Sequence, residues 1–188
     1  METFKQQWRT ASFDLTKIIV YGQVPDLHMR IEAFFGGVKT LLDLLAQLLS
    51  SEQIVAAVVD GFHRAQDTYG GKVLNALDHN ALGNRKDAAA KVRALIVDHK
   101  ALWIDEAIRA RDHLVHPEKG MHQLMFQLDF LAQGDTVVCE RINPPIIGAE
   151  AIDHYARGVL THAHSFSSDL LRLLQEATVS NSGMEPTR

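Results

Sequence analysis

The chain has 188 residues, of which 46% are hydrophobic and 22% are charged, and its formal net charge at pH 7 is -4. This length and composition are typical of one globular domain with a sizeable core. The negative charge argues against a surface that binds nucleic acids irrespective of sequence, because such a surface needs many lysine and arginine side chains; a small basic cleft is still compatible with it. The single cysteine, Cys139, excludes an intrachain disulfide and a cysteine-rich metal site.

The sequence carries no targeting signal that we can identify. Its first ten residues include several charged and polar side chains and lack the apolar core of a signal peptide. The most apolar stretch, residues 27–49, contains Arg30, Glu32, Lys39 and Asp43, which disfavour a membrane span. We therefore expect a cytoplasmic protein that does not bind a membrane.

Apolar residues recur at helical spacing through the first half of the chain. The first helix predicted in this way has the apolar positions Phe4, Trp8, Ala11, Leu15 and Ile18, and ends near residues 21–22. The second begins at Pro25, with Asp26 as its N-cap, and continues to residue 49. It is apolar over much of its circumference, which indicates a central helix or one shared with a partner chain. Its Gly36-Gly37 pair predicts a kink or a close helix approach.

A third helix is predicted over residues 54–69. Ser50 and Gln53 form a capping-box pattern ahead of it, and Gly70-Gly71 ends it. A short helical turn is expected over residues 73–78, and further helices over residues 86–97 and 103–115, the last ended by Pro117.

The pattern changes after Pro117. Residues 124–130 alternate between apolar and polar side chains, as a half-buried strand does, and residues 136–142 are rich in β-forming residues. The turn sequence Gln133-Gly134-Asp135 between them predicts a hairpin over about residues 122–142. A long amphipathic helix follows from about residue 149.

The fold class that these elements predict is mainly α: a helical bundle with one β-hairpin inserted before the last long helix. We expect residues 1–178 to form this single domain and residues 179–188 to form a flexible C-terminal tail.

One charged residue falls where the helix over residues 103–115 should be apolar. On a helical wheel, Arg111 lies between two apolar groups: Trp103, Ala107, Ala110 and Leu114 on one side, and Ile104, Ile108 and Val115 on the other. A guanidinium there is costly unless it has a partner or lines a cleft. It could equally extend its charged end to solvent or make a structural ion pair.

His116 precedes Pro117, so its backbone is pushed out of the helical region and its side chain can turn toward Arg111. Asp112, four residues earlier, can orient the imidazole. The alternative is a histidine that interacts only with the C-terminal end of the helix dipole.

These residues carry a family resemblance. An Arg-x4-His pattern with a polar residue after the arginine, at the end of a helix in an all-α bundle, resembles the signature of the HEPN domains. Arg111, Asp112 and His116 occupy the three motif positions. The resemblance covers about residues 27–177 in architecture but only about seven residues in motif. The hairpin at residues 124–142 departs from the plainest form of that bundle and resembles an insertion in some uncharacterised relatives.

The resemblance implies metal-independent RNA cleavage without a cofactor, in which the 2′-hydroxyl attacks the adjacent phosphate. His116 would move protons, Arg111 would hold the phosphate and Asp112 would orient the histidine. It also implies a homodimer with RNA or a nucleotide in a shared groove, a toxin or defence role, and an antitoxin-like protein partner. The excess apolar surface of the second helix independently favours a homodimer.

Two other functions remain open at this point. The first is a non-catalytic dimer that binds RNA, a nucleotide or a partner, since members of this family also serve as binding modules. The second is a metal-dependent helical-bundle hydrolase, with His113 and His116 as ligands together with His154, His162 or His164.

Overall fold

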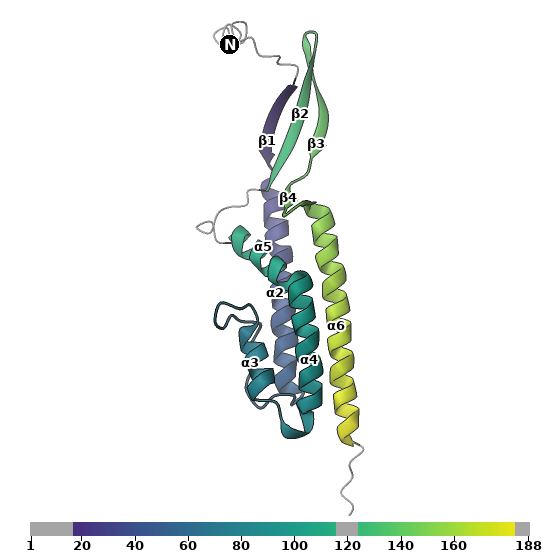
Figure 1. Ribbon diagram of the computed structural model, residues 1–188. Helices are drawn as coiled ribbons and strands as arrows, with labels where there is room; N and C mark the ends of the chain where they lie inside the picture. The colour runs from purple at the N-terminus through teal and green to yellow at the C-terminus, as the bar shows by residue number, and fades with distance from the viewer. Residues whose placement is uncertain (1–16, 116–123, 183–188) are drawn as a thin grey trace, which may run out of the picture.

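The computed structural model describes residues 17–115 and 124–182. Three long helical segments lie side by side and form the body of the molecule (Figure 1). They are α2 (Pro25–Ser51), α4 (Lys86–His99) and α6 (Ile152–Ser182), and the shorter α3 (Gly71–His79) packs against α4. The mainly α class predicted from the sequence is confirmed.

Helix α2 contributes a continuous row of core side chains, among which Phe35, Leu42 and Leu49 are at most 1% exposed. The helix continues through the Gly36-Gly37 pair, and a Cβ atom at either glycine would meet nothing within 4 Å, so this pair is not a close helix contact. The predicted N-cap is also wrong. Val24 occupies that position without a side-chain cap, and Asp26 lies in the first turn of the helix.

By length and composition alone, α2 over Asp26–Ser51 could cross a membrane, with a mean hydropathy of 1.3. A core helix of a water-soluble protein meets the same criterion, and α2 supplies much of this core. Its Lys39–Asp43 ion pair would also have to be accommodated in a bilayer. The cytoplasmic location therefore stays a prediction.

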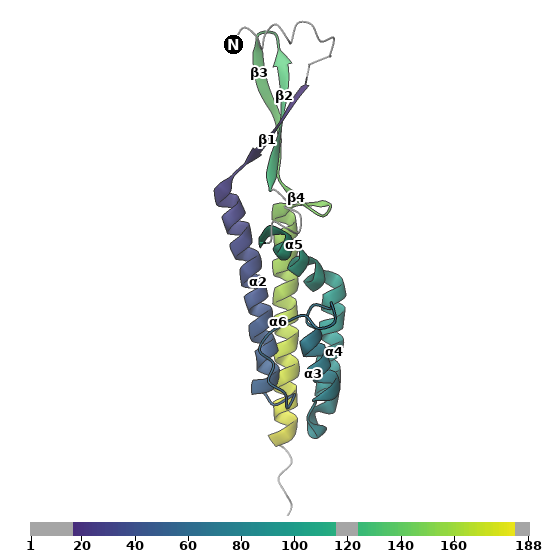
Figure 2. The same cartoon turned by 90° about the vertical axis from the view of Figure 1, so that its left-hand side faces the viewer.

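Helices α4 and α5 (Asp105–Val115) are joined by a π-helical turn over Lys100–Ile104, without an intervening loop. Beyond this turn α5 leaves the direction of α4 and crosses toward α2, in both views (Figures 1 and 2). A π turn holds one residue more than an α-helical turn and often marks a functional or strained position. Here it brings the C-terminal half of α5 next to α2.

The predicted hairpin is confirmed and has a third strand. Strands β2 (Met125–Gln133) and β3 (Thr136–Asn143) pair antiparallel, and β1 (Lys17–Gln23) adds to the other edge of β2. The sheet extends beyond the ends of the helices (Figure 2). The short strands β4 (Ile146–Ile147) and β5 (Glu150–Ala151) connect it to α6.

The first predicted helix is wrong over its last residues, because residues 18–22 belong to β1. The strand is rich in β-branched residues, and pairing with β2 outweighs the helical spacing. The rest of that predicted helix, residues 4–16, lies outside the described residues.

The third predicted helix is also wrong, because residues 52–70 form a loop of turns and bends. Ser50 is not an N-cap but lies inside α2, where its hydroxyl donates to the Ala57 carbonyl and accepts from the Val59 amide. Val58, an apolar residue within the predicted helix, is 90% exposed. Gln53 has a φ of 54°, which an α-helix cannot accommodate.

At the C-terminal end, α6 continues through Val179 to Ser182, four residues into the segment predicted as a tail; residues 183–188 lie outside the described part of the chain. Helix α6 packs mainly against α4 and more lightly against α2.

Candidate functional site

Arg111 lies on α5, the helix that packs against α2, and its side chain is 31% exposed. The side chain is therefore partly buried, and it makes an ion pair with Asp112, which is one of the alternatives that the sequence left open. One guanidinium nitrogen, Nη1, donates to Asp112 Oδ1 at 3.1 Å. The Nε atom is buried and has no hydrogen-bond partner among the described residues. A buried donor without a partner is unfavourable, and a hydrogen bond to an acceptor such as a phosphate oxygen would remove that cost.

Asp112 is held from two sides. Its Oδ1 atom accepts from Arg111, and its Oδ2 atom accepts from the hydroxyl of Tyr69 at 3.1 Å. The side chain is 15% exposed. These contacts fix the carboxylate beside Arg111, so the first two motif residues form one ordered pair on α5.

Tyr69 connects this pair to the π turn. Its backbone carbonyl accepts from Lys100 Nζ at 2.5 Å, and the same ammonium group donates to Asp105 at 2.5 Å. The Arg64 guanidinium lies over the Tyr69 ring, 4.0 Å from its centroid. Burial raises the pKa of the Tyr69 hydroxyl, and the negative charge of Asp112 and the hydrogen bond to it raise it further. Tyr69 therefore stays protonated and acts as a hydrogen-bond donor to Asp112 at neutral pH.

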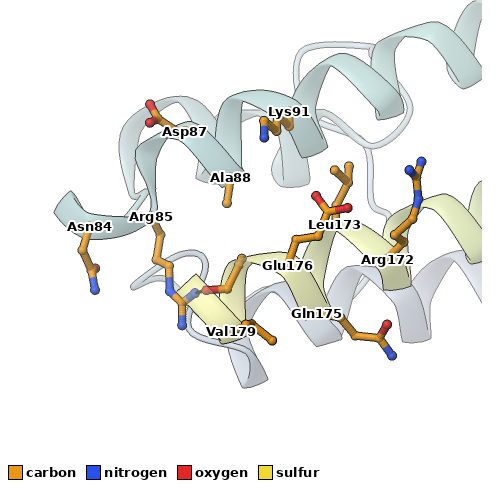
Figure 3. Close-up of a pocket in the computed structure, with 11 residues that line it drawn as sticks. Asn84, Arg85, Asp87, Ala88, Lys91, Arg172, Leu173, Gln175, Glu176 and Val179 are labelled. Atoms are coloured by element: carbon orange, nitrogen blue, oxygen red, sulfur yellow. Dashed lines mark hydrogen bonds between the residues drawn. The ribbon is translucent and has the colours of Figure 1, made fainter. Parts of the chain in front are cut away.

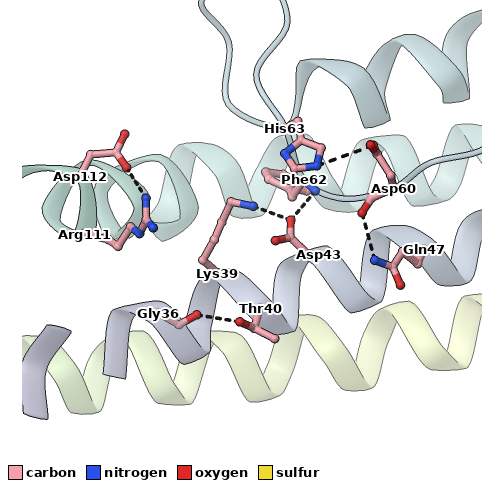
Figure 4. Close-up of polar contacts among 10 residues, drawn as sticks. All are labelled: Gly36, Lys39, Thr40, Asp43, Gln47, Asp60, Phe62, His63, Arg111 and Asp112. Carbon is pink, nitrogen blue, oxygen red and sulfur yellow. Dashed lines mark hydrogen bonds and ion pairs between the residues drawn. The ribbon is translucent and has the colours of Figure 1, made fainter. Parts of the chain in front are cut away.

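The loop that carries Arg64 and Tyr69 is fixed to α2 by polar contacts (Figure 4). Asp43 accepts from the Phe62 amide at 2.6 Å and from Lys39, and Gln47 donates to the Asp60 carbonyl at 3.0 Å. Gly61 is required next to them, because a Cβ atom there would lie 2.7 Å from Asp43 Oδ1. The loop thus presents Tyr69 to α5 in a defined position.

His116, the third predicted site residue, lies outside the described residues. The structure therefore brings Arg111 and Asp112 together and leaves the position of the histidine open. Sequence reasoning missed Tyr69, Arg64 and Lys100. Tyr69 is the last residue of the predicted third helix, which does not form, and neither cation belongs to a recognisable pattern.

The hollows that we identify in the described part of the molecule are not lined by Arg111 or Asp112. One, of about 840 Å³, lies between the start of α4 and the end of α6 (Figure 3). Its most buried cation, Arg85, donates to the carbonyl of Ala177, and Arg172 pairs with Asp169 at 3.0 Å. These two cations are used within the fold.

Another hollow, of about 490 Å³, lies between α6 and the segment formed by the π turn and α5. Its lining includes Glu106, Glu150, His154 and His162. It also includes Tyr155, whose hydroxyl is buried without a hydrogen-bond partner among the described residues. Burial raises the pKa of this hydroxyl, and the charges of Glu106 and Glu150 add to the effect.

Within residues 17–115 and 124–182, no three histidine, cysteine, aspartate or glutamate side chains are grouped so that they could hold a metal ion. His154 and His162 of the proposed metal set do not form such a group with Glu106 and Glu150, although all four line one hollow.

No protein-family model, no curated protein and no solved structure that we compared with this chain matches it.

Proposed function

We propose that this chain is a HEPN-like, metal-independent endoribonuclease whose site is formed by Arg111, Asp112 and His116. The observation that supports this proposal is the state of Arg111. Its side chain is 31% exposed, its buried Nε atom has no hydrogen-bond partner among the described residues, and Asp112 fixes its orientation. A guanidinium held in this way can bind a phosphate without first having to be ordered.

In the proposed reaction, the ribose 2′-oxygen attacks the adjacent phosphorus and the bond from phosphorus to the 5′-oxygen breaks. The products are a 2′,3′-cyclic phosphate and a free 5′-hydroxyl. His116 takes the proton of the 2′-hydroxyl or supplies one to the leaving oxygen, because an imidazole exchanges protons near neutral pH. Arg111 stabilises the charge that develops on the phosphate oxygens.

Asp112 has two roles in this proposal. It holds the Arg111 guanidinium, and it orients His116, which follows four residues later in the sequence. Tyr69 supports both roles, because its hydroxyl donates a hydrogen bond to Asp112 Oδ2 and so holds the carboxylate in place. We further propose a cytoplasmic homodimer with RNA in a shared groove, and a defence or toxin role with an antitoxin-like partner.

One observation favours a second candidate, a non-catalytic dimer that binds RNA, a nucleotide or a partner protein. The contacts of Arg111, Asp112 and Tyr69 with one another would also form if the motif served only to hold α5 to the loop. The geometry of these three residues is the same for an endoribonuclease and for a binding module, so a measurement of activity has to distinguish the two functions.

The deciding experiment incubates the full chain with a mixed RNA pool, with and without EDTA, and identifies the product ends. We expect cleavage that resists EDTA and leaves cyclic phosphates. His116→Ala should abolish it. Arg111→Lys should lose roughly 10²–10³-fold in rate, because an ammonium lacks the planar pair of donors. Asp112→Asn should fall between these variants and the wild type.

His113→Ala is the matched control, since it changes the neighbouring histidine of the same motif. It should be nearly silent in the proposed mechanism, but damaging if His113 and His116 together bound a metal. Cleavage that EDTA abolishes would favour the metal-dependent hydrolase. Equal activity of His116→Ala and the wild type would end the catalytic assignment, and no cleavage at all would favour the binding module.

A further inference from the structure

The loop over residues 52–70 contains a tight two-residue turn. Ala65 and Thr68 form an antiparallel bridge in which each backbone amide donates to the carbonyl of the other residue, at 3.1 Å and 3.0 Å. The two residues between them, Gln66 and Asp67, have φ values of 50° and 59°. A positive φ at both central positions is the pattern of a type I′ turn, which reverses the chain as a small hairpin.

This turn places Arg64 opposite Tyr69. The two are the next residues outward from the Ala65–Thr68 pair, and residues directly opposite each other in antiparallel segments have their side chains on the same face. Accordingly, the guanidinium carbon of Arg64 lies 4.0 Å from the centroid of the Tyr69 ring. We call these two side chains the Arg64–Tyr69 stack.

The guanidinium of Arg64 is available to a ligand. The residue is exposed, and its side chain contacts Tyr69 and pairs with no carboxylate among the described residues. Arg93 on α4, by contrast, pairs with Asp78 at 2.5 Å. A guanidinium that lies on an aromatic ring with one face and is accessible from the other side can stack with a second flat group.

The Arg64–Tyr69 stack is connected to the proposed phosphate site. The Tyr69 hydroxyl donates to Asp112, and Asp112 accepts from Arg111. Figure 4 shows Arg111 and Asp112 on the same side of α2 as this loop. A continuous series of contacts therefore leads from the exposed guanidinium of Arg64 to the guanidinium of Arg111.

We propose that the Arg64–Tyr69 stack binds an unpaired base of the RNA next to the phosphate at Arg111, so that the substrate is single-stranded. The inference rests on the proposed function, whose phosphate site it extends. In a duplex each base is covered by its neighbours, whereas the bases of single strands and loops can turn outward and stack on aromatic or guanidinium planes. Arg64 would contact the base, and Tyr69 would support Arg64 from the other side.

The charge of the chain favours such a contact over phosphate contacts alone. With a formal net charge of -4, the protein has no excess of cations with which to hold many phosphates. A stacked base adds affinity that does not depend on a large basic surface.

The loop that carries the stack is ordered by contacts within the fold. Asp43 of α2 accepts from the Phe62 amide at 2.6 Å. The loop also packs tightly on the start of α3, because a Cβ atom at Gly71 would lie 2.6 Å from the Ala65 carbonyl oxygen. Side chains that are held in place before binding lose less conformational entropy when the ligand binds.

The test measures binding of the full chain to a 2′-O-methyl RNA oligonucleotide, which lacks the attacking hydroxyl, both as a single strand and annealed to its complement. Arg64→Lys keeps the charge and loses the plane, whereas Arg64→Gln keeps a flat amide and loses the charge. Arg93→Lys, at the ion-paired arginine of α4, is the matched control. Fluorescence anisotropy gives the dissociation constants, and cleavage of a mixed RNA pool is measured in parallel.

We expect the wild type to bind the single strand at least about ten-fold more tightly than the duplex. Arg64→Lys and Arg64→Gln should each weaken binding of the single strand by about ten-fold or more and binding of the duplex much less, and Arg93→Lys should bind as the wild type does. Wild-type affinity of Arg64→Lys for the single strand would overturn the proposal. An equal loss on both forms would overturn it too, because Arg64 would then contact only phosphate.

The cleavage assay separates this inference from the proposed function. Cleavage by the wild type together with unchanged binding by both Arg64 variants would overturn the inference and leave the endoribonuclease standing. Binding that prefers the single strand and depends on Arg64, without cleavage, would support the base-binding stack and count against the endoribonuclease. A wild type that binds neither form would overturn the inference.

Discussion

The partly buried His99, which directly precedes the π turn, gives a testable pH dependence. His99 Nδ1 accepts a hydrogen bond from Trp103 Nε1 at 2.9 Å, and its ring packs on Phe166 with the ring centroids 5.1 Å apart. A protonated imidazole carries hydrogen on both nitrogens and would direct an N–H at the Trp103 N–H. The fold therefore requires the neutral form of His99.

Burial lowers the pKa of His99 in the folded state. The charges around it partly cancel: Asp169 on α6 and Asp98 on α4 raise the pKa, while His162 on α6 lowers it. Because the unfolded chain binds this proton more readily, the stability from neutral His99 is fully present above the unfolded pKa of about 6.5. It is lost as the pH falls from there toward the folded pKa. One such proton changes the free energy of unfolding by at most about 1.4 kcal/mol per pH unit.

The perturbation that isolates this effect is His99→Gln, whose amide oxygen can still accept from Trp103 but does not titrate. We expect the free energy of unfolding of the wild type to fall more steeply than that of the variant between about pH 7 and about pH 5. Urea unfolding followed by circular dichroism at several pH values measures both slopes. His164→Gln, an exposed histidine of α6, is the control. If His99→Gln and the wild type had the same slope, the assignment of a neutral His99 would be refuted.

Three further substitutions test the packing. Tyr155→Phe should raise the free energy of unfolding by about 1 kcal/mol, because it removes a buried hydroxyl that has no partner among the described residues; a loss in urea unfolding would contradict this. Gly70→Ala should lower the free energy of unfolding by about 1–3 kcal/mol, because Gly70 has a φ of +66° and a Cβ atom would lie 2.2 Å from the Phe62 ring. An unchanged melting temperature would contradict this loop geometry. Leu49→Ala, at a side chain with no exposure, should cost about 2–5 kcal/mol in urea unfolding, and a cost below about 1 kcal/mol would argue against its place in the core.

The sequence correctly predicts those helices and strands whose apolar residues follow a long and regular spacing. Helices α2, α4 and α6 and the β2–β3 hairpin each have long, regular patterns, and all are confirmed. Strand β1 was missed because its residues continue a helical spacing, and only pairing with β2, more than a hundred residues later in the chain, makes them a strand. In residues 52–70, Ile54 and Phe62 are buried individually by different parts of the fold, so their helical spacing is a coincidence.

For the candidate site, the helical wheel places Arg111 beside the apolar side of α5, and the structure shows it partly buried there. The wheel could not predict what holds the arginine and its neighbour. Tyr69 reaches Asp112 from a loop 43 residues away in sequence, and that loop is positioned by side chains of α2. Such contacts depend on the tertiary fold and leave no local pattern.

The π turn explains why these distant residues meet. It changes the direction of the helix between α4 and α5, so that Arg111 and Asp112 approach α2 and do not continue along α6. Lys100 lies within this turn and is only 8% exposed, yet its ammonium group is matched by Asp105 and by the Tyr69 carbonyl. A buried cation left without these acceptors would be strongly unfavourable. The contacts that neutralise Lys100 therefore also connect the loop over residues 52–70 to the π turn. Tyr69 of that loop in turn donates to the Asp112 carboxylate, which holds Arg111.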